Sequence, residues 1–216
     1  MIGLIHRTFS NTASVHCRKL LYLSLVRPVL TYCSSVWRPN LLKDIIVLEN
    51  VQWRATKHIL NDFTMDYKSR LISLNLLPLM MTCETNDLAF FLKCLQSPSE
   101  AFNIFNFVNF CSSSTRSSGL KLKHHYCNNN TSRHFFFNCL PWLWNRLPPL
   151  DYSLPLSALI SFLKSFFWSH FLKHFDSSNP CTFHLMCPCS KCLTFHSTPN
   201  FNPLFQFPPP YPSDIV

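Results

Sequence analysis

Apolar residues recur every three or four positions over residues 44–60, and this spacing constrains the fold more than any other feature of the chain. It predicts an amphipathic helix with Asp44 as its N-cap. The face expected to be buried consists of Ile45, Leu48, Val51, Ala55 and Ile59. The opposite, polar face consists of Glu49, Gln52, Arg54, Lys57 and His58. Because a helix with one apolar stripe has to bury it against other elements, the pattern predicts a helical bundle.

Four further segments have helical periodicity, and we expect helices over residues 15–30, 68–74, 79–95 and 157–175. Pro28 lacks an N–H and is expected to bend or end the first of them. The side chains expected to face inward are Leu21, Leu25 and Val26 in 15–30, Leu88, Phe91, Leu92 and Leu95 in 79–95, and Leu159, Phe162, Leu163, Phe166 and Phe167 in 157–175. The fold class predicted is therefore all-α.

The composition along the chain changes twice, which divides it into three predicted regions. Residues 1–98 are expected to form a small helical bundle with short connections. Residues 99–175 contain a serine-rich linker, an aromatic-rich stretch and one long helix. Residues 176–216 are rich in cysteine and proline without periodicity, so we expect an irregular, largely disordered tail.

The chain is basic and contains few charged residues. Its formal net charge is +9 and only 13% of its residues are charged, which admits nucleic acid or an anionic membrane surface as a partner. Residues 111–150 contain five Lys or Arg and no Asp or Glu. Two interpretations of this segment stay open: a solvated polar loop and a phosphate-contacting surface.

Neither a secretory signal nor a membrane span is expected. The first ten residues lack a sustained apolar core followed by a cleavage site. The most apolar window, 154–172, contains Pro155, Lys164 and His170, whereas a spanning helix needs about twenty mostly uncharged residues. We therefore expect an intracellular chain, nuclear or cytoplasmic, whose eleven cysteines are reduced.

Two blocks of residues, in order and together covering about residues 2–175, resemble reverse transcriptases of non-LTR (LINE-type, jockey-like) retrotransposons. The first block matches at Leu21, Tyr22, Leu25, Val26, Arg27, Pro28, Leu30, Tyr32, Cys33, Val36, Trp37, Pro39, Leu48, Glu49, Val51, Gln52, Arg54, Ala55 and Thr56. The second matches at Thr115, Arg116, Lys121, Leu122, Arg133, Phe136, Phe137, Trp144, Asn145, Leu147, Pro148, Leu159, Phe162, Leu163 and Lys164. Both blocks are similar to the part of those enzymes that follows the polymerase palm.

The resemblance implies a thumb-like bundle that grips the RNA–DNA template–primer duplex of the full-length relative. The basic residues that would contact phosphates are Arg18, Lys19, Arg27, Arg54 and Lys57. A solvated helix face is the alternative interpretation. Trp53 departs from the pattern, because such sequences commonly have a second basic residue at that position.

The chemistry of polymerisation is not expected in this chain. Reverse transcription needs carboxylates that hold two metal ions, and these elements supply them from a Tyr-x-Asp-Asp turn. The seven aspartates here are scattered with no adjacent pair, and two glycines are too few for a phosphate loop. Magnesium would thus be a cofactor only of the full-length relative. Two alternatives to a catalytically incomplete fragment remain open: an independent nucleic-acid- or zinc-binding helical module, and a membrane-associated helical protein.

A cluster of cysteine and histidine near the C-terminus has the ligand types of a zinc site, and it consists of Cys181, His184, Cys187, Cys189, Cys192 and His196. The predicted ligands are Cys187, Cys189, Cys192 and His196, because thiolates and imidazoles at spacings of two to four residues can close a tetrahedral site. The alternative is a reduced, irregular tail that binds no metal.

Overall fold

The computed structural model describes residues 13–97, 103–111, 120–125, 127, 129–187 and 192. Within these ranges the fold is all-α, as predicted, and the only β-type pairing is a single antiparallel bridge between Phe110 and Leu122. The helical elements are α2 (Val15–Leu21), η1 (Tyr22–Val26), α3 (Arg27–Thr31), α4 (Ser34–Trp37), α5 (Leu42–Leu60), α6 (Tyr67–Ser73), α7 (Leu79–Gln96), η2 (Ile104–Asn106), α8 (Asn130–Arg133), α9 (Phe136–Trp144), α10 (Leu156–His174) and η3 (Pro180–Phe183).

The first predicted helix is present, but a π turn interrupts it. Elements α2 and α3 are joined by the π-helical turn η1, and Pro28 lies in the first turn of α3. Pro28 has no N–H to donate to the carbonyl of Ser24, and the wider turn directly precedes it. The extra residue in that turn rotates the following side chains. Tyr22 and Val26 are buried while Leu25 is 47% exposed, so the prediction that Leu25 faces inward is wrong.

Helix α5 begins three residues earlier than expected. Leu41 is its N-cap, and Asp44 lies in its first turn, where a carboxylate interacts favourably with the positive end of the helix dipole. The prediction that Asp44 caps the helix is therefore wrong. The predictions for α6 and α7 are confirmed to within one residue at each end.

The buried stripe of α5 includes polar residues that the periodicity placed on the outer face. Its members are Ile45, Glu49, Gln52, Ala55, Thr56 and Ile59. Leu48 and Val51 are only partly buried and flank this stripe. The prediction that Glu49 and Gln52 face solvent is thus wrong.

A hydrogen-bonded network satisfies these buried polar groups. The Gln52 amide accepts from the hydroxyl of Tyr22 at 2.8 Å and donates to the carbonyl of Leu77 at 3.0 Å and to the hydroxyl of Tyr67 at 3.3 Å. Glu49 accepts from the Tyr67 hydroxyl at 2.5 Å and from the backbone N–H of Leu79 at 2.9 Å. The network joins η1, α5, α6 and the start of α7, and it explains why α5 tolerates an amide and a carboxyl in its core.

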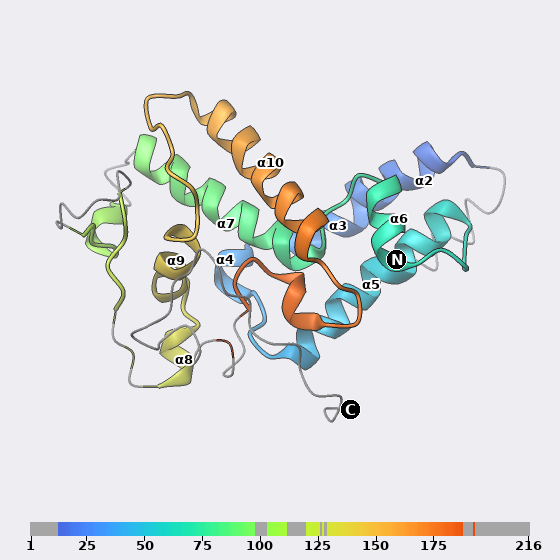
Figure 1. Ribbon diagram of the computed structural model, residues 1–216, viewed down its shortest axis with the longest axis horizontal. Coiled ribbons are helices and arrows are strands. Elements are labelled where there is room, and N and C mark those ends of the chain that lie inside the picture. Colours follow the sequence, from blue (N-terminus) through green and yellow to red (C-terminus); the bar gives the residue numbers. More distant parts are fainter. Residues whose placement is uncertain are drawn as a thin grey trace.

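Helix α7 is the central element of the fold. It packs against α3, α4 and α5 and also against α9, α10 and η3, and Figure 1 shows α10 running alongside it. One hydrophobic cluster of buried residues extends from Tyr22 to Met186. The first and second predicted regions therefore share a core.

Helix α10 confirms the predicted long helix, with a narrower buried face than expected. Its buried residues are Leu159, Leu163, Phe167 and Phe171, which are four residues apart. Phe162 is 40% exposed, so the prediction that it is buried is wrong. None of the helices in the described part of the chain is both long and apolar enough to cross a membrane.

The chain after α10 is ordered against the core as far as residue 187. Phe183, Leu185 and Met186 belong to the hydrophobic cluster. The buried carboxylate of Glu84 on α7 accepts from the backbone N–H of Leu185 at 2.7 Å and from that of Met186 at 3.3 Å. The expectation of disorder is therefore wrong for residues 176–187, which are irregular apart from η3, while residues 188–191 and 193–216 lie outside the described residues.

Candidate functional site

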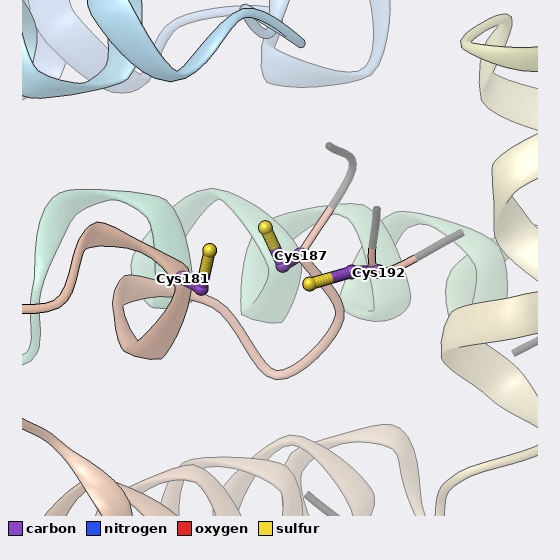
Figure 2. Close-up of side chains that lie close together, drawn as sticks. All are labelled: Cys181, Cys187 and Cys192. Carbon is purple, nitrogen blue, oxygen red and sulfur yellow. The ribbon is translucent and has the colours of Figure 1, made fainter. Parts of the chain in front are cut away.

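Three cysteine side chains converge at the end of the described chain. The sulfur atoms of Cys181, Cys187 and Cys192 all lie within 4.8 Å of one another, and Figure 2 shows the Cys192 side chain pointing toward the other two. The three residues are 8%, 6% and 1% exposed. This buried triad can hold a metal ion.

Local turns position the first of these cysteines. Pro180 begins η3, and the side chain of Asn179 caps it by accepting from the backbone N–H of Cys181 at 3.1 Å. The Thr182 hydroxyl donates to the carbonyl of Asp176 at 2.8 Å, which closes the loop between α10 and η3. Together with the anchoring of residues 185 and 186 on Glu84, these bonds fix both ends of the segment that carries Cys181 and Cys187.

The sulfur separations fit a tetrahedral ion after a small contraction. A zinc–sulfur distance of about 2.3 Å implies sulfur atoms about 3.8 Å apart around a tetrahedral centre. The observed upper bound of 4.8 Å exceeds this by about one ångström, a change that side-chain torsions can supply.

A cavity of about 60 Å³ adjoins the thiols. Its lining includes the three cysteines, the imidazoles of His170, His174 and His184, and the Arg146 side chain. Burial, and secondly the neighbouring His174, lower the pKa of His170 to about 4, so this imidazole is neutral at neutral pH. The cavity wall therefore offers nitrogen as well as sulfur donors.

Arg146 places a positive charge beside the thiols. Its Nη1 donates to the carbonyl of Leu185 at 2.8 Å. Burial lowers the pKa of Arg146, and the nearby charges of Glu84 and Cys192 oppose that effect. A guanidinium at this position favours ionised thiols, the form that binds metals.

The predicted zinc ligands are brought together in part. Cys187 and Cys192 are both in the triad, whereas Cys189 and His196 lie outside the described residues. Cys181 was not among the predicted ligands. Cys181 is farther from the nearest predicted ligand than the spacing of two to four residues by which the ligands were chosen. The only signal for it was its membership of the same cysteine-rich stretch.

Two of the five predicted phosphate-contacting residues instead hold the bundle together. Arg18 Nη1 donates to the carbonyl of His58 at 2.8 Å and so ties α2 to the last turn of α5. Arg27 Nη2 donates to the carbonyl of Leu77 at 3.2 Å and to the Thr82 hydroxyl at 2.6 Å, near the start of α7. Burial lowers the pKa of the Arg27 guanidinium, although the nearby Tyr22 and Glu49 partly oppose this.

The other three predicted cations differ in their solvent access, and one lies against Trp53. Arg54 is exposed, while Lys19 and Lys57 are half-buried. Lys57 Nζ lies 3.6 Å from the centre of the Trp53 ring, and the guanidinium carbon of Arg70 lies 5.4 Å from it. Trp53 is 37% exposed. The residue that departs from the family pattern thus has two cations beside its ring.

Comparison of the chain with protein-family models, with curated proteins and with solved structures finds no match. The resemblance to retrotransposon reverse transcriptases therefore stays a prediction from the motifs. The function has to be inferred from the thiol triad and from the cationic surface around Trp53.

Proposed function

We propose that this chain is a helical module that binds one zinc ion through Cys181, Cys187 and Cys192. The observation that carries the proposal is the convergence of three buried sulfur atoms within 4.8 Å. The ion would be structural, because a buried site with several thiolates is typical of closed zinc centres. It would tie residues 181–192 together against α7 and α10.

The donor set favours zinc over the metals of phosphate chemistry. Thiolates are soft ligands that select zinc, copper(I) or iron–sulfur clusters, whereas magnesium and calcium prefer oxygen. The adjacent guanidinium of Arg146 offsets part of the negative charge that three thiolates bring to the site.

The zinc content of the chain tests this proposal. Protein purified under reducing conditions is expected to contain about one zinc per chain, and Cys181→Ser or Cys192→Ser is expected to abolish that content. Cys111→Ser is the matched control, because Cys111 is exposed and lies outside the triad. A fully reduced chain that takes up no zinc from buffered solution would overturn the proposal.

We also propose that the exposed surface around Trp53 contacts nucleic acid, as the post-palm region would in the reverse transcriptases that this chain resembles. In this proposal the chain is a catalytically incomplete fragment that once gripped the template–primer duplex. Arg54 and Lys57, which follow Trp53 on α5, support it by offering cations for phosphate contacts. Arg18 and Arg27 would act by holding α2 and α3 in place.

Binding to a labelled RNA–DNA duplex at several salt concentrations tests this second proposal. Replacing Arg54 and Lys57 by Ala is expected to weaken binding and to reduce the slope of log K against log salt by about 1 per lost phosphate contact. Lys173→Ala, which replaces an exposed lysine on α10, is the matched control. Absence of binding at low salt, or an equal effect of the control, would contradict the proposal.

A further inference from the structure

A structural zinc site is completed by a fourth ligand, and three thiolates leave that position open. The cavity beside the thiols is lined by three imidazoles, those of His170, His174 and His184. One of these imidazoles, or a residue outside the described ranges, would have to supply the fourth ligand of a tetrahedral zinc site.

The surroundings of His184 distinguish it from the other two. Its side chain is 1% exposed, and its Nε2 is buried with no hydrogen-bond partner among the described residues. A buried ring nitrogen without a partner is uncommon, because the group loses its hydrogen bonds to water and gains none in the protein. The rings of His170 and His174 pack against each other with centroids 4.8 Å apart.

The other nitrogen of His184 faces a carboxylate. Nδ1 lies 3.5 Å from Oε1 of Glu84, a residue that is itself 1% exposed. A carboxylate that accepts from one imidazole nitrogen while the other ligates the metal is the common arrangement around protein-bound zinc.

The sequence spacing agrees with this arrangement. His184 lies three residues after Cys181 and three before Cys187. The two backbone N–H groups that follow His184, those of Leu185 and Met186, donate to the same carboxylate. Glu84 thus holds the His184 ring and the backbone leading to Cys187 together.

We propose that His184 Nε2 is the fourth zinc ligand, giving a Cys181, His184, Cys187, Cys192 site with Glu84 as the positioning residue. This rests on the proposed zinc site. The group within 4.8 Å comprises the three sulfurs and does not include His184, so this proposal requires the His184 ring and the thiols to move closer together when the metal binds.

Cobalt(II) substitution tests the ligand set. In the unaltered chain, the thiolate-to-cobalt absorption should have the intensity of three thiolates and one nitrogen. His184→Gln is expected to weaken metal binding by more than tenfold, and Glu84→Gln, which removes the orienting carboxylate, by about 10- to 100-fold. His184→Cys should retain cobalt and raise the absorption to that of four thiolates. Far-UV circular dichroism of each metal-free variant separates lost ligation from lost folding.

Variants of the other cysteine and histidine side chains test whether one of them, instead of His184, is the fourth ligand. His170→Gln, His174→Gln, Cys189→Ser and His196→Gln are each expected to leave metal affinity within about twofold, since none is assigned as a ligand. The inference on His184 is overturned if any of these four weakens binding as strongly as loss of a cysteine, or if His184→Cys leaves the cobalt absorption unchanged. A chain that binds neither zinc nor cobalt instead overturns the zinc proposal itself.

Discussion

Glu49 is a carboxyl group buried where α5, α6 and the start of α7 meet. It accepts hydrogen bonds from the Tyr67 hydroxyl and the Leu79 N–H, and it is 3% exposed. Burial raises the pKa of Glu49 to about 7, against the opposing effects of those two hydrogen bonds and of Arg27. Its charge state therefore affects the stability of the fold near neutral pH.

The contribution of Glu49 to the stability of the chain is expected to fall as pH rises through the range set by this carboxyl. The lowered pKa of His170 has the opposite effect on stability, so the Glu49 contribution has to be measured as a difference between two proteins. The folded pKa of about 7 lies above the ordinary value of 4.5, so the folded chain keeps the proton longer than the unfolded chain. The contribution to stability is complete below about pH 4.5 and is lost as pH rises to about 7, in total about 3 kcal/mol at 1.36 kcal/mol per pKa unit. Urea unfolding at several pH values measures it.

Glu49→Gln isolates this effect, because an amide at that position resembles the protonated acid. The difference in unfolding free energy between the two proteins should change by about 3 kcal/mol between pH 4.5 and pH 8. Glu84, Asp87 and His170 titrate equally in both proteins, so their contributions cancel in the difference. Asp44→Asn, an exposed change on the same helix, is the control. A pH-independent difference for Glu49→Gln would show that the buried carboxyl does not titrate in this range.

Burial at residues 49 and 52 was not predictable from periodicity. Within 44–60 a glutamate and a glutamine belong to the polar face by residue type alone. Their hydrogen-bond partners are Tyr22, Tyr67, Leu77 and Leu79, which are outside that window. Only the arrangement of four elements makes their burial favourable.

At the scale of elements, α10 shows how narrow a buried helical face is. Phe162 and Phe167 are five residues apart on one helix, and they are 40% and 0% exposed. Phe167 lies on the stripe with Leu163 and Phe171 that belongs to the core. The two phenylalanines form a matched pair that differs mainly in burial.

Phe167→Ala is expected to destabilise the chain by about 3–5 kcal/mol, because it removes a fully buried ring and leaves a cavity. Phe162→Ala is expected to change the unfolding free energy by no more than about 0.5–1 kcal/mol, since that ring is partly exposed. Chemical denaturation with an unchanged m-value measures both. Equal losses for the two variants would mean that α10 is rotated from the orientation described.

The helices themselves were predictable where the apolar pattern was long. The positions of α5, α7 and α10 follow from periodicity to within three residues at each end. The short α4, α8 and α9 were not predicted. Helices α4 and α8 have only four residues each, too few for a repeat, and α9 contains Pro141 in its interior. The π turn at Tyr22–Val26 was also missed. This turn changes which side chains are buried, but the number of apolar residues in the segment stays the same, so the sequence pattern does not reveal it.

For the whole molecule, one core joins parts of the chain that composition separates. Helix α7 ends just before the predicted boundary at residue 98, yet α9, α10 and η3 all cover it. Phe91 contacts Trp144 edge to face with ring centroids 4.8 Å apart. The proposed metal site likewise depends on tertiary structure. Cysteine spacing pointed to Cys187 and Cys192, whereas Cys181 and Glu84 become relevant only through tertiary structure.

The shared core predicts that residues 1–98 do not fold independently. Removing residues 99–216 would expose Leu88, Phe91 and Leu92, which are at most 1% exposed in the full chain, and would leave the Glu84 carboxylate without its backbone donors. Exposing so much apolar surface costs about 25 cal/mol per Å². The fragment is expected to retain partial helicity without a cooperative thermal transition, whereas the full chain should unfold in one transition. Circular dichroism melting of both proteins makes the comparison. A cooperative transition in the fragment would instead establish the first 98 residues as an autonomous helical bundle.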